Sequence, residues 1–365
     1  MNNPVIIVGA GLAGLRAATL LQAEGIDYRI LEARNRVGGR ILTNVSSYVP
    51  ESGKFDLGPT WFWPRYEKSI SKLVQELQLE TFAQYTQGAM LFERYEGRSP
   101  ERHVLPENAI ERSLRFTDGA QALINALVDQ LPLDKIELGV HVKAMDLSRE
   151  SISIRAEDVE GNTKEYTANH VIFALPPRLI AKHIHFSPVL SEQTLRDLMN
   201  KPTWMASQAK AVAVYDRPFW RETGHSGMAS SWIGPLQEIH DASPETGTGA
   251  LFGFFGMPAK TRQELGETQI SKLVIDQLVR LFGPEAREVQ TILLQDWSTE
   301  PDTTVQDDLT PLQSYPDYGE ISIDGNWKHK IIFAGTETSL NYGGHLEGAL
   351  LSAERAVNMI IKFVK

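Results

Sequence analysis

The chain has 365 residues and a formal net charge of −10, from 46 acidic and 36 basic side chains. Hydrophobic residues make up 42%, as in a globular protein with a large core, and the length suggests about two domains. The negative charge argues against a general binder of nucleic acids or anionic membranes, which needs a basic face. The chain has no cysteine, which excludes disulfides, cysteine metal ligands and thiol nucleophiles.

The two ends of the sequence carry no signal for a secretory leader or a membrane anchor. The apolar run over residues 5–15 contains glycines and ends at Arg16, short of the roughly 20 residues that cross a bilayer. No basic residue precedes it, and Lys362 and Lys365 interrupt the last apolar stretch. The nine histidines are scattered. We therefore expect a cytoplasmic protein without a metal site that binds neither membranes nor nucleic acid.

A dinucleotide-binding pattern opens the chain. Residues 5–8 form an apolar, β-branched run typical of a buried parallel strand, and a glycine turn, a helical segment over 15–21 and a strand over 28–31 follow. Such glycines allow a tight turn, the approach of backbone N–H groups to a pyrophosphate and close packing of helix on sheet. Glu32, 18 residues after Gly14, is placed to bind a ribose hydroxyl, which disfavours NADP and leaves NAD or FAD. The predicted contacts are Gly9, Gly11, Leu12, Ala13, Gly14 and Glu32.

The segment after Glu32 favours FAD. Residues 33–40, Ala-Arg-Asn-Arg-Val-Gly-Gly-Arg, place arginines around a diglycine, so that the backbone can approach a bulky cofactor and an arginine can pair with a pyrophosphate oxygen. This segment resembles the FAD-dependent amine oxidase family of monoamine, polyamine and L-amino-acid oxidases, with relatives among protoporphyrinogen oxidases and carotenoid desaturases. The resemblance implies FAD, with Ala33, Arg34, Gly39 and Arg40 among its contacts.

The resemblance extends along the chain. Residues 56–61, Asp-Leu-Gly-Pro-Thr-Trp, resemble the second flavin-contacting loop of the family. This implies contacts from Gly58, Pro59 and Thr60, and makes Trp61 a candidate wall of the flavin site. Trp61 and Trp63 could equally pack in the core. Residues 115–119, 140–145 and 171–177 resemble the return to the cofactor domain, the strand beside the adenine and the exit from that domain.

The C-terminal block is the second specific match. A buried strand over 331–334 precedes Gly-Thr-Glu-Thr, and Gly-Gly-His-Leu-Glu-Gly-Ala over 343–349 opens a helix. In the family such a block places a helix N-terminus at the pyrimidine end of the flavin, where it stabilises the negative charge of the reduced form. The implied contacts are Gly335, Glu337, Gly344, His345 and Leu346, together with Val142, Ala174 and Trp297 elsewhere.

Lys210 is the strongest candidate for chemistry. It is the single charge in an apolar strand over 208–215, eight residues before Pro218. A buried ammonium is costly unless it is paired, shifted in pKa or placed at a wet site. The family has a lysine at this spacing that hydrogen-bonds through water to flavin N5, which implies that Lys210 assists reoxidation by oxygen. The alternative is a lysine at a strand edge that reaches solvent.

Two positions depart from the family. Typical amine oxidases hold the substrate nitrogen between two aromatic side chains, and His345 stands where one of them is expected. His345 is a candidate for binding substrate or accepting a proton, or else a passive wall residue. Residues 307–315 replace the region of the other aromatic, with Tyr315 and Tyr318 as loosely aligned candidates. In monoamine oxidases that region also holds a flavin-linking cysteine, so non-covalent FAD is expected here.

Two regions bear on access to the site. Residues 80–114 stand where typical members carry a long helical insertion over the substrate, so we expect a more open site or one closed by a partner chain, such as a second copy in a homodimer. Residues 296–327 contain eight acids and no lysine or arginine. That stretch would either steer a cationic amine or lie solvated.

We therefore expect an α/β fold with two discontinuous domains. A Rossmann-type FAD-binding domain takes residues 1–80, 116–180 and 296–365, and a substrate domain with a mixed sheet and helices takes 81–115 and 181–295. The expected reaction is oxidation of an amine C–N bond to an imine with dioxygen, with Lys210, His345 and Trp61 at the reacting end. The alternatives are a C–C dehydrogenase or desaturase, or an FAD-binding partner subunit with little activity of its own.

Overall fold

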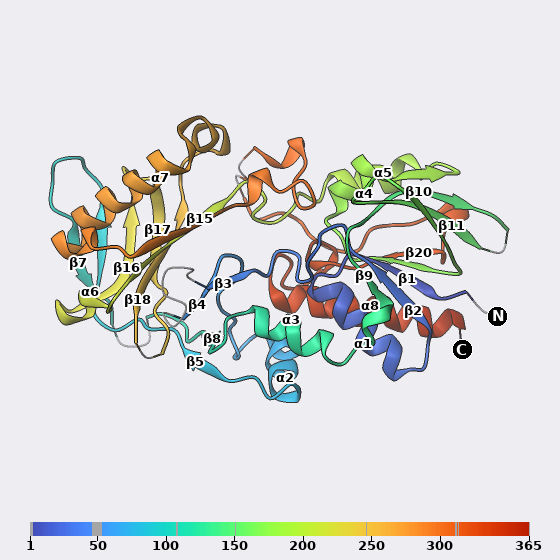
Figure 1. The fold of residues 1–365 in the computed structure, drawn as a ribbon, viewed down its shortest axis with the longest axis horizontal. Coiled ribbons are helices and arrows are strands. Elements are labelled where there is room, and N and C mark those ends of the chain that lie inside the picture. The colour runs from blue at the N-terminus through green and yellow to red at the C-terminus, as the bar shows by residue number, and fades with distance from the viewer. Residues whose placement is uncertain are drawn as a thin grey trace.

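The computed structural model describes residues 3–45, 53–106, 109–149, 151–245, 247–310, 312 and 314–364. Figure 1 shows an elongated molecule with a helix-covered sheet system at the end that holds both termini and a second sheet, covered by α7 (Ala259–Phe282), at the other end. Met1, Asn2 and Lys365, which entered the expectations about leader and anchor, lie outside the described residues. Within these ranges no helix is both long and apolar enough to cross a membrane.

The first sheet is parallel and has five strands in the order β20-β13-β1-β2-β9. Its strands are short and apolar because both faces are covered, so each residue meets a hydrophobic layer. Alternate residues such as Ile7, Ile30 and Ile172 face one layer of helices, and Ile6, Val8 and their neighbours face the other side. The strand bounds are Val5–Val8 (β1), Tyr28–Leu31 (β2), Ile136–Glu137 (β9), Val171–Phe173 (β13) and Ile331–Phe333 (β20).

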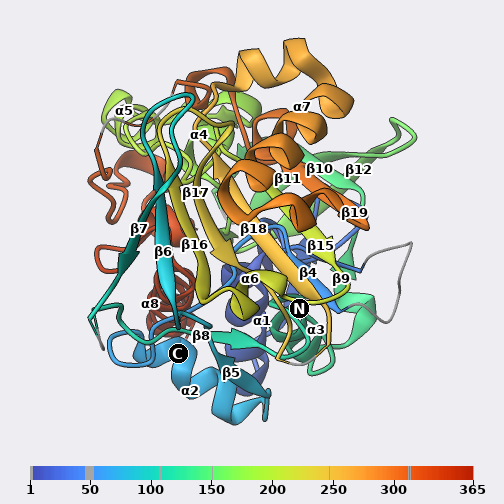
Figure 2. The same ribbon diagram turned by 90° about the vertical axis from the view of Figure 1, so that its left-hand side faces the viewer.

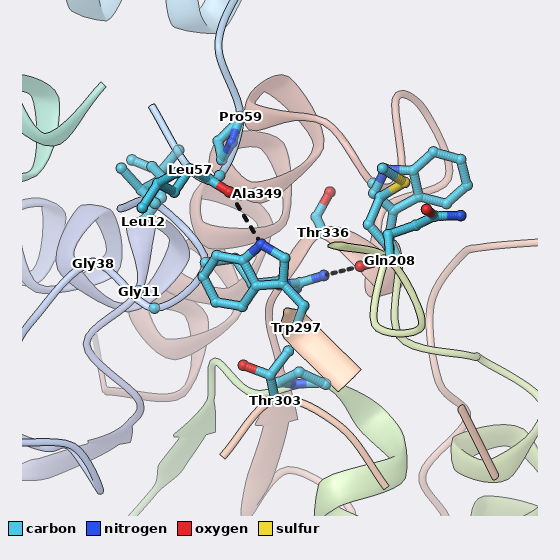
Figure 3. Close-up of a pocket in the computed structure, with 18 of the residues that line it drawn as sticks. Gly11, Leu12, Gly38, Leu57, Pro59, Gln208, Trp297, Thr303, Thr336 and Ala349 are labelled. Atoms are coloured by element: carbon cyan, nitrogen blue, oxygen red, sulfur yellow. Dashed lines mark hydrogen bonds between the residues drawn. The ribbon is translucent and has the colours of Figure 1, made fainter. Parts of the chain in front are cut away.

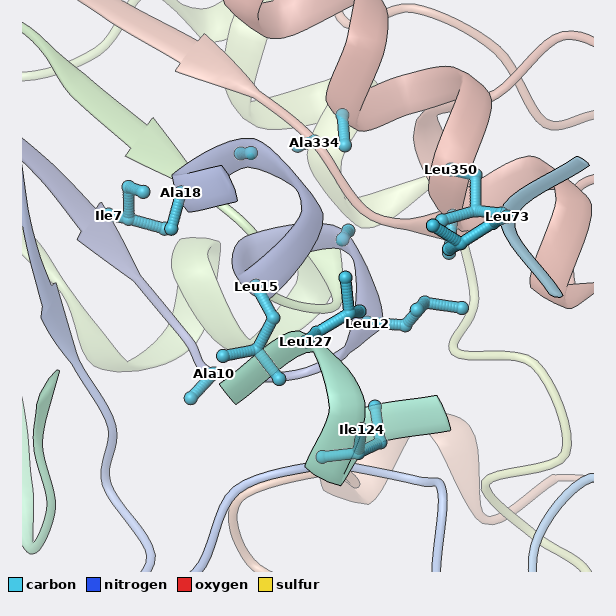
Figure 4. Close-up of a cluster of buried hydrophobic side chains, with 14 of the residues drawn as sticks. Ile7, Ala10, Leu12, Leu15, Ala18, Leu73, Ile124, Leu127, Ala334 and Leu350 are labelled. Atoms are coloured by element: carbon cyan, nitrogen blue, oxygen red, sulfur yellow. The ribbon is translucent and has the colours of Figure 1, made fainter. Parts of the chain in front are cut away.

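The helices on the first face share one core with the sheet. Figure 4 shows Leu15 of α1 beside Ile124 and Leu127 of α3, and Leu73 of α2 beside Leu350 of α8. These small and branched apolar residues recur at helical spacing, which buries one stripe of each helix. The helices are α1 (Leu12–Ala23), α2 (Lys68–Glu76), α3 (Gln121–Val128) and α8 (Leu346–Val364).

The opposite face of the parallel sheet packs against a four-stranded sheet, in the order β12-β11-β10-β14. Its strands alternate buried and exposed residues, as expected where one face meets the core and one meets water. The bounds are Val140–Leu147 (β10), Ile152–Asp158 (β11), Thr163–Ala168 (β12) and His185–Ser187 (β14), with helices α4 (Pro177–His183) and α5 (Glu192–Met199) nearby.

The other end of the molecule is a seven-stranded mixed sheet, in the order β19-β15-β18-β17-β16-β6-β7. Only β16 and β6 pair in parallel, and α7 packs on one face, as Figure 2 shows. The opposite face of the central strands β15 and β18 packs against Phe55 and Leu57. The bounds are Ala89–Glu93 (β6), Glu101–Val104 (β7), Ala209–Tyr215 (β15), His225–Ser231 (β16), Leu236–Asp241 (β17), Gly249–Phe255 (β18) and Thr291–Asp296 (β19).

Short elements complete the chain. Two-stranded pairs join β3 to β4 and β5 to β8, and the helix α6 follows β15. Their bounds are Thr43–Val45 (β3), Lys54–Asp56 (β4), Thr81–Ala83 (β5), Leu114–Phe116 (β8) and Phe219–Glu222 (α6). Single 3-10 turns span Leu133–Lys135, Pro284–Arg287, Trp297–Thr299, Gln306–Asp308, Gly325–Trp327 and Thr336–Thr338.

The predicted fold class, a two-domain α/β protein with a Rossmann-type domain and a mixed second sheet, is confirmed. The first helix begins at Leu12, three residues before its predicted start, because the glycine turn feeds directly into it. Between α2 and α3 the described residues form strands and loops without a helix, at the place where the longer members were expected to carry their insertion. The residue-level division into domains stays a prediction.

Candidate active site

A cavity of about 1170 Å³ runs between the parallel sheet and the seven-stranded sheet, with walls from both. Pockets for drug-sized ligands have roughly 300–1,000 Å³, so this one has room for a larger ligand together with a second molecule. It brings together the predicted site residues except Gly14, Glu337 and the two loosely aligned candidates, Tyr315 and Tyr318. Contact of these residues with a cofactor stays a prediction.

One end of the cavity is made by backbone at the carboxyl edge of the parallel sheet. Gly9 has a φ of +104°, and a side chain there would meet the carbonyl oxygen of Ala174. The N-cap of α1, Gly11, offers no side-chain cap, so the first-turn N–H groups open towards the cavity. Gly14 lies behind this turn, where a Cβ would approach Gly9 O to 1.9 Å. Its role is therefore to let α1 pack on the turn.

Glu32 lines the cavity at this end. It is buried, and its two carboxylate oxygens accept hydrogen bonds from Ala10 N at 2.7 Å and Arg34 N at 3.0 Å. These bonds hold the carboxylate at the cavity wall, where its remaining lone pairs can accept hydroxyl donors.

The arginines of the diglycine segment have partners within the protein. Arg40 lines the cavity, but its guanidinium donates two hydrogen bonds to the carboxylate of Glu337, at 2.5 and 3.0 Å. Glu337 is fully buried outside the cavity lining, where it also accepts a bond from Trp204 N. Arg36 donates to backbone carbonyls of its own loop. Glu337 therefore acts by holding Arg40 in place, and a phosphate contact of Arg40 stays a prediction.

The middle of the cavity is organised by Trp297, which Figure 3 places between Gly11 and Gly38 on one side and Gln208 and Thr336 on the other. Its indole N–H donates to Leu57 O at 3.2 Å, and its backbone N–H donates to Gln208 O at 3.0 Å. These bonds join the loop after β4 to the start of β15, so Trp297 links the β3–β4 pair to the seven-stranded sheet at the cavity wall.

Lys210 lies on β15, an interior strand, and only 1% of the residue is exposed. Its ammonium donates to Thr60 Oγ1 at 2.5 Å and to Gly58 O at 3.1 Å, and it lies 4.1 Å from the ring centre of Phe252. Burial lowers the pKa of Lys210 to about 7, with Asp56 opposing the shift. The alternative of a lysine that reaches solvent is therefore wrong.

The far end of the cavity is a row of rings. His240, Trp61, Trp63 and His345 follow one another, with ring centres 5.0, 6.1 and 5.7 Å apart. All four line the cavity, so the two tryptophans form a wall of the site. Wide aromatic surfaces bury much apolar area while holding their own geometry.

A carboxylate holds the histidine at each end of this row. His345 Nδ1 lies 2.8 Å from Glu67 Oε1, and His240 Nε2 lies 2.6 Å from Glu238 Oε1. The hydrogen bond from His240 lowers the pKa of Glu238. Sequence reasoning missed three of these residues. Glu238 and His240 share one face of β17, a two-residue alternation that could have indicated them, whereas Glu67 precedes α2 and reads as an ordinary helix cap.

The expectation that Tyr315 or Tyr318 supplies the second aromatic of the site needs correction. Tyr315 and Tyr318 are absent from the cavity lining, because Tyr318 donates to the buried Pro202 O and Tyr315 bonds to Gly343 O. The aromatic that lines the cavity beside Gly344 is Trp204, whose ring packs 5.1 Å from that of Tyr315.

The acidic stretch 296–327 is largely neutralised by basic groups from elsewhere. Asp296 pairs with Arg262, Asp308 with Arg178 and Glu300 with Arg34, and of the eight acids only Asp302 lines the cavity. These pairs fasten the stretch to its surroundings. Across the part of the chain that the structure describes, no cluster of His, Asp or Glu is arranged to hold a metal ion.

Comparison with known proteins gives two family matches. The model for flavin-containing amine oxidoreductases matches residues 82–361, and that for an NAD(P)-binding Rossmann-like domain matches residues 7–77. The relatives include a probable flavin-containing monoamine oxidase A from Dictyostelium discoideum, 23% identical over 96% of both chains, and an L-amino acid dehydrogenase from Synechocystis, 25% identical over 98% of this chain and 94% of the relative. The Dictyostelium alignment is 453 positions long, so the relative carries insertions that this chain lacks.

The fold has close counterparts among solved structures. Putrescine oxidase in complex with putrescine superposes with a TM-score of 0.81 at 20% identity, over 99% of both chains. The family model covers most of the chain, from the strands after α2 to the last helix. The chain therefore belongs to the family of flavin-containing amine oxidoreductases and is a flavin-dependent oxidoreductase.

Proposed function

We propose that the chain binds FAD non-covalently and oxidises the C–N bond of an amine to an imine, with dioxygen as the electron acceptor. The observation that carries this proposal is Lys210, a buried ammonium at the cavity wall, bound to the loop that runs from Gly58 to Trp61. When bound, the flavin supplies the electron-accepting chemistry, taking a hydride equivalent from the carbon next to the substrate nitrogen.

The dinucleotide end fits the adenosine and pyrophosphate of FAD. The uncapped first turn of α1 offers N–H groups and a positive helix end to phosphate oxygens, and Glu32 is placed for a ribose hydroxyl. The glycines at 38 and 39 keep side chains away from this wall. Because the chain has no cysteine, a thioether to the flavin is excluded, which supports non-covalent binding.

The middle of the cavity fits the flavin ring. The first turn of α8 reaches it through Leu346 and Ala349, so the positive end of a long helix would stabilise the negative charge of a reduced flavin held there. Lys210 would hold a water or a developing negative charge from the opposite wall. Its lowered pKa allows it to give and take a proton near neutral pH.

The row of rings supports an amine substrate. Trp61 and Trp63 exclude water from the reacting carbon, and their faces attract a cationic amine as it approaches. Carboxylates lie at both ends of the row, so the walls favour a positively charged ligand.

The test is anaerobic reduction of the flavin on the purified yellow protein, with benzylamine, putrescine, spermidine and L-phenylalanine in turn. Bleaching by one amine, followed by recovery of the colour in air with release of peroxide, is the expected result. Bleaching without recovery in air would favour a dehydrogenase with another acceptor, the second candidate that the Synechocystis relative suggests. If none of the four amines bleached a protein with tightly bound FAD, the proposed amine oxidation would be wrong.

A further inference from the structure

The substrate end of the cavity holds a titratable ring that the proposed function leaves without a task. We propose that His345 accepts a proton from the ammonium group of the substrate at Nε2, and that Glu67 positions the ring for this transfer. The inference rests on the proposed function, because it assigns the base that prepares the same amine. Its structural basis is the 2.8 Å contact between His345 Nδ1 and Glu67 Oε1.

Glu67 is held in one orientation. Its side chain is 3% exposed, and its second oxygen, Oε2, accepts a hydrogen bond from Trp63 N at 2.7 Å. Glu67 is also the N-cap residue of α2, where the positive end of the helix attracts a carboxylate. A fixed, charged acceptor therefore faces Nδ1 of the histidine.

This contact decides which ring nitrogen is free. A charged carboxylate only accepts hydrogen bonds, so Nδ1 of His345 carries the hydrogen, and the neutral ring keeps its lone pair on Nε2. His345 lines the cavity with 34% of its side chain exposed, and its Nε2 has no hydrogen-bond partner among the described residues. The ring thus offers a free acceptor in a side chain that lines the cavity.

Other charged groups near the ring are engaged elsewhere. Glu347 of α8 accepts bonds from the backbone of α2 at Ser69 N and Ile70 N. Lys68 donates to Pro64 O, and the side chain of Arg65 pairs with Glu111. Besides Glu67, the ring of Tyr342 lies near His345, with centres 6.3 Å apart. Of the described residues, Glu67 alone makes a charged contact with this ring.

The step moves one proton and no electrons. The nitrogen–hydrogen bond of the substrate ammonium breaks, its electron pair stays on the nitrogen, and the proton bonds to His345 Nε2. The positive charge moves from the substrate to the ring, where Glu67 stabilises it, and the ring returns the proton to water. Simple amines resemble lysine, so only about one molecule in a thousand is neutral at pH 7. A base in the cavity supplies the neutral form directly.

The first experiment identifies the ring hydrogen in the flavin-bound protein without substrate. In 15N-labelled protein, the nitrogen signals of His345 are assigned by their loss in His345→Gln. We expect hydrogen on Nδ1 and a free Nε2. Glu67→Gln should mix the two forms, because an amide can turn to donate as well as accept. Hydrogen on Nε2 in the parent protein would overturn the proposal.

The second experiment measures anaerobic flavin reduction by benzylamine, putrescine, spermidine and L-phenylalanine against pH. At pH 7, His345→Gln should slow reduction by about a hundredfold, the usual contribution of a general base. The difference in rate between the parent and His345→Gln should shrink tenfold for each unit of increasing pH, because the neutral amine becomes more abundant. Glu67→Gln should slow flavin reduction less at pH 7, and its rate should likewise approach that of the parent as the pH rises. A variant His345→Gln with the parent's rates and pH profile would overturn the proposal.

Glu347→Gln is the matched control, since it removes a buried carboxylate from the same helix junction without touching the ring. The pH profile of its flavin reduction should equal that of the parent. If Glu347→Gln slowed flavin reduction as much as Glu67→Gln does, the positioning role of Glu67 would be overturned. The outcomes distinguish a failure of the proposed amine oxidation from a failure of the base role of His345. Absence of reduction by all four amines overturns the proposed function and the base together, whereas normal reduction with hydrogen on Nε2 overturns the base alone.

Discussion

The two ends of the cavity are built in different ways. The dinucleotide end is made by backbone groups from one stretch of chain, the turn from Gly9 into α1, with Glu32 close behind in sequence. The reacting end is made by side chains from separate segments, namely Trp61, Glu67, Lys210, His240 and His345. A site made of local backbone tolerates few substitutions and is visible in the sequence, whereas a site made of distant side chains can change its chemistry one residue at a time.

The two ends also hold their carboxylates differently. Glu32 is fixed by two backbone N–H donors. Glu67 and Glu238 each contact a histidine ring that can change its protonation. A ribose hydroxyl needs only a fixed acceptor, which a carboxylate held by backbone donors provides. A reacting amine needs a group that exchanges protons, which a histidine beside a carboxylate provides.

The largest effect is expected at the dinucleotide end. Gly14→Val places a Cβ 1.9 Å from Gly9 O, so α1 must move off the turn that we propose holds the pyrophosphate. We expect a colourless protein that retains no FAD, measured by visible absorbance, and a loss of at least about 1–3 kcal/mol in the free energy of unfolding. Gly25→Asn, just beyond the other end of the same helix, has no neighbour within 4 Å and should keep the flavin. Equal flavin content in both variants would contradict a backbone-built site.

The next effect belongs to the reacting end. Lys210→Met removes the ammonium bound to Thr60 and should slow reoxidation of the reduced flavin by air by about a hundredfold, the scale of one preorganised charge. Stopped-flow mixing of reduced enzyme with oxygen measures the rate. Flavin content and anaerobic reduction by an amine should change much less. Reoxidation at the rate of the parent protein would show that Lys210 has no part in the oxygen step.

The same residue gives a pH signature in stability. Burial lowers the pKa of Lys210 from 10.5 to about 7, so between these pH values the unfolded chain binds a proton that the folded protein lacks. The free energy of unfolding of the parent should therefore rise with pH across this window relative to Lys210→Met, by up to about 1.4 kcal/mol per pH unit. Urea titrations of both proteins at pH 7 and pH 10 measure the difference. A constant difference would mean that Lys210 titrates normally.

The smallest effect is expected at Glu238, whose side chain is 58% exposed although its carboxylate contacts His240 at 2.6 Å. Glu238→Gln should raise the KM for putrescine by less than about threefold, since exposed charge pairs contribute about 0–1 kcal/mol. The KM for benzylamine, which has one charge, should stay unchanged and is the internal control. A tenfold rise for putrescine would place Glu238 closer to the substrate than its exposure implies.

The dinucleotide-binding pattern and the fold class could both be predicted from the sequence. A parallel strand, a glycine turn and a helix are neighbours in sequence, and their geometry follows from local backbone sterics. Lys210 could also be predicted, because a lone charge within an apolar strand stands out against its surroundings. The flavin-dependent activity came through resemblance to a family, carried by these same local segments.

The proposed reacting end depends on contacts between segments that are far apart in the sequence. Glu67 meets His345 across 278 residues, and Glu337 takes the guanidinium of Arg40 across 297. Such contacts depend on how α2, α8 and the diglycine loop pack, and packing is set by the shape of the whole core. In the sequence nothing distinguishes the partners of Glu67 and Glu337, because the donor that a carboxylate meets depends on segments far away along the chain.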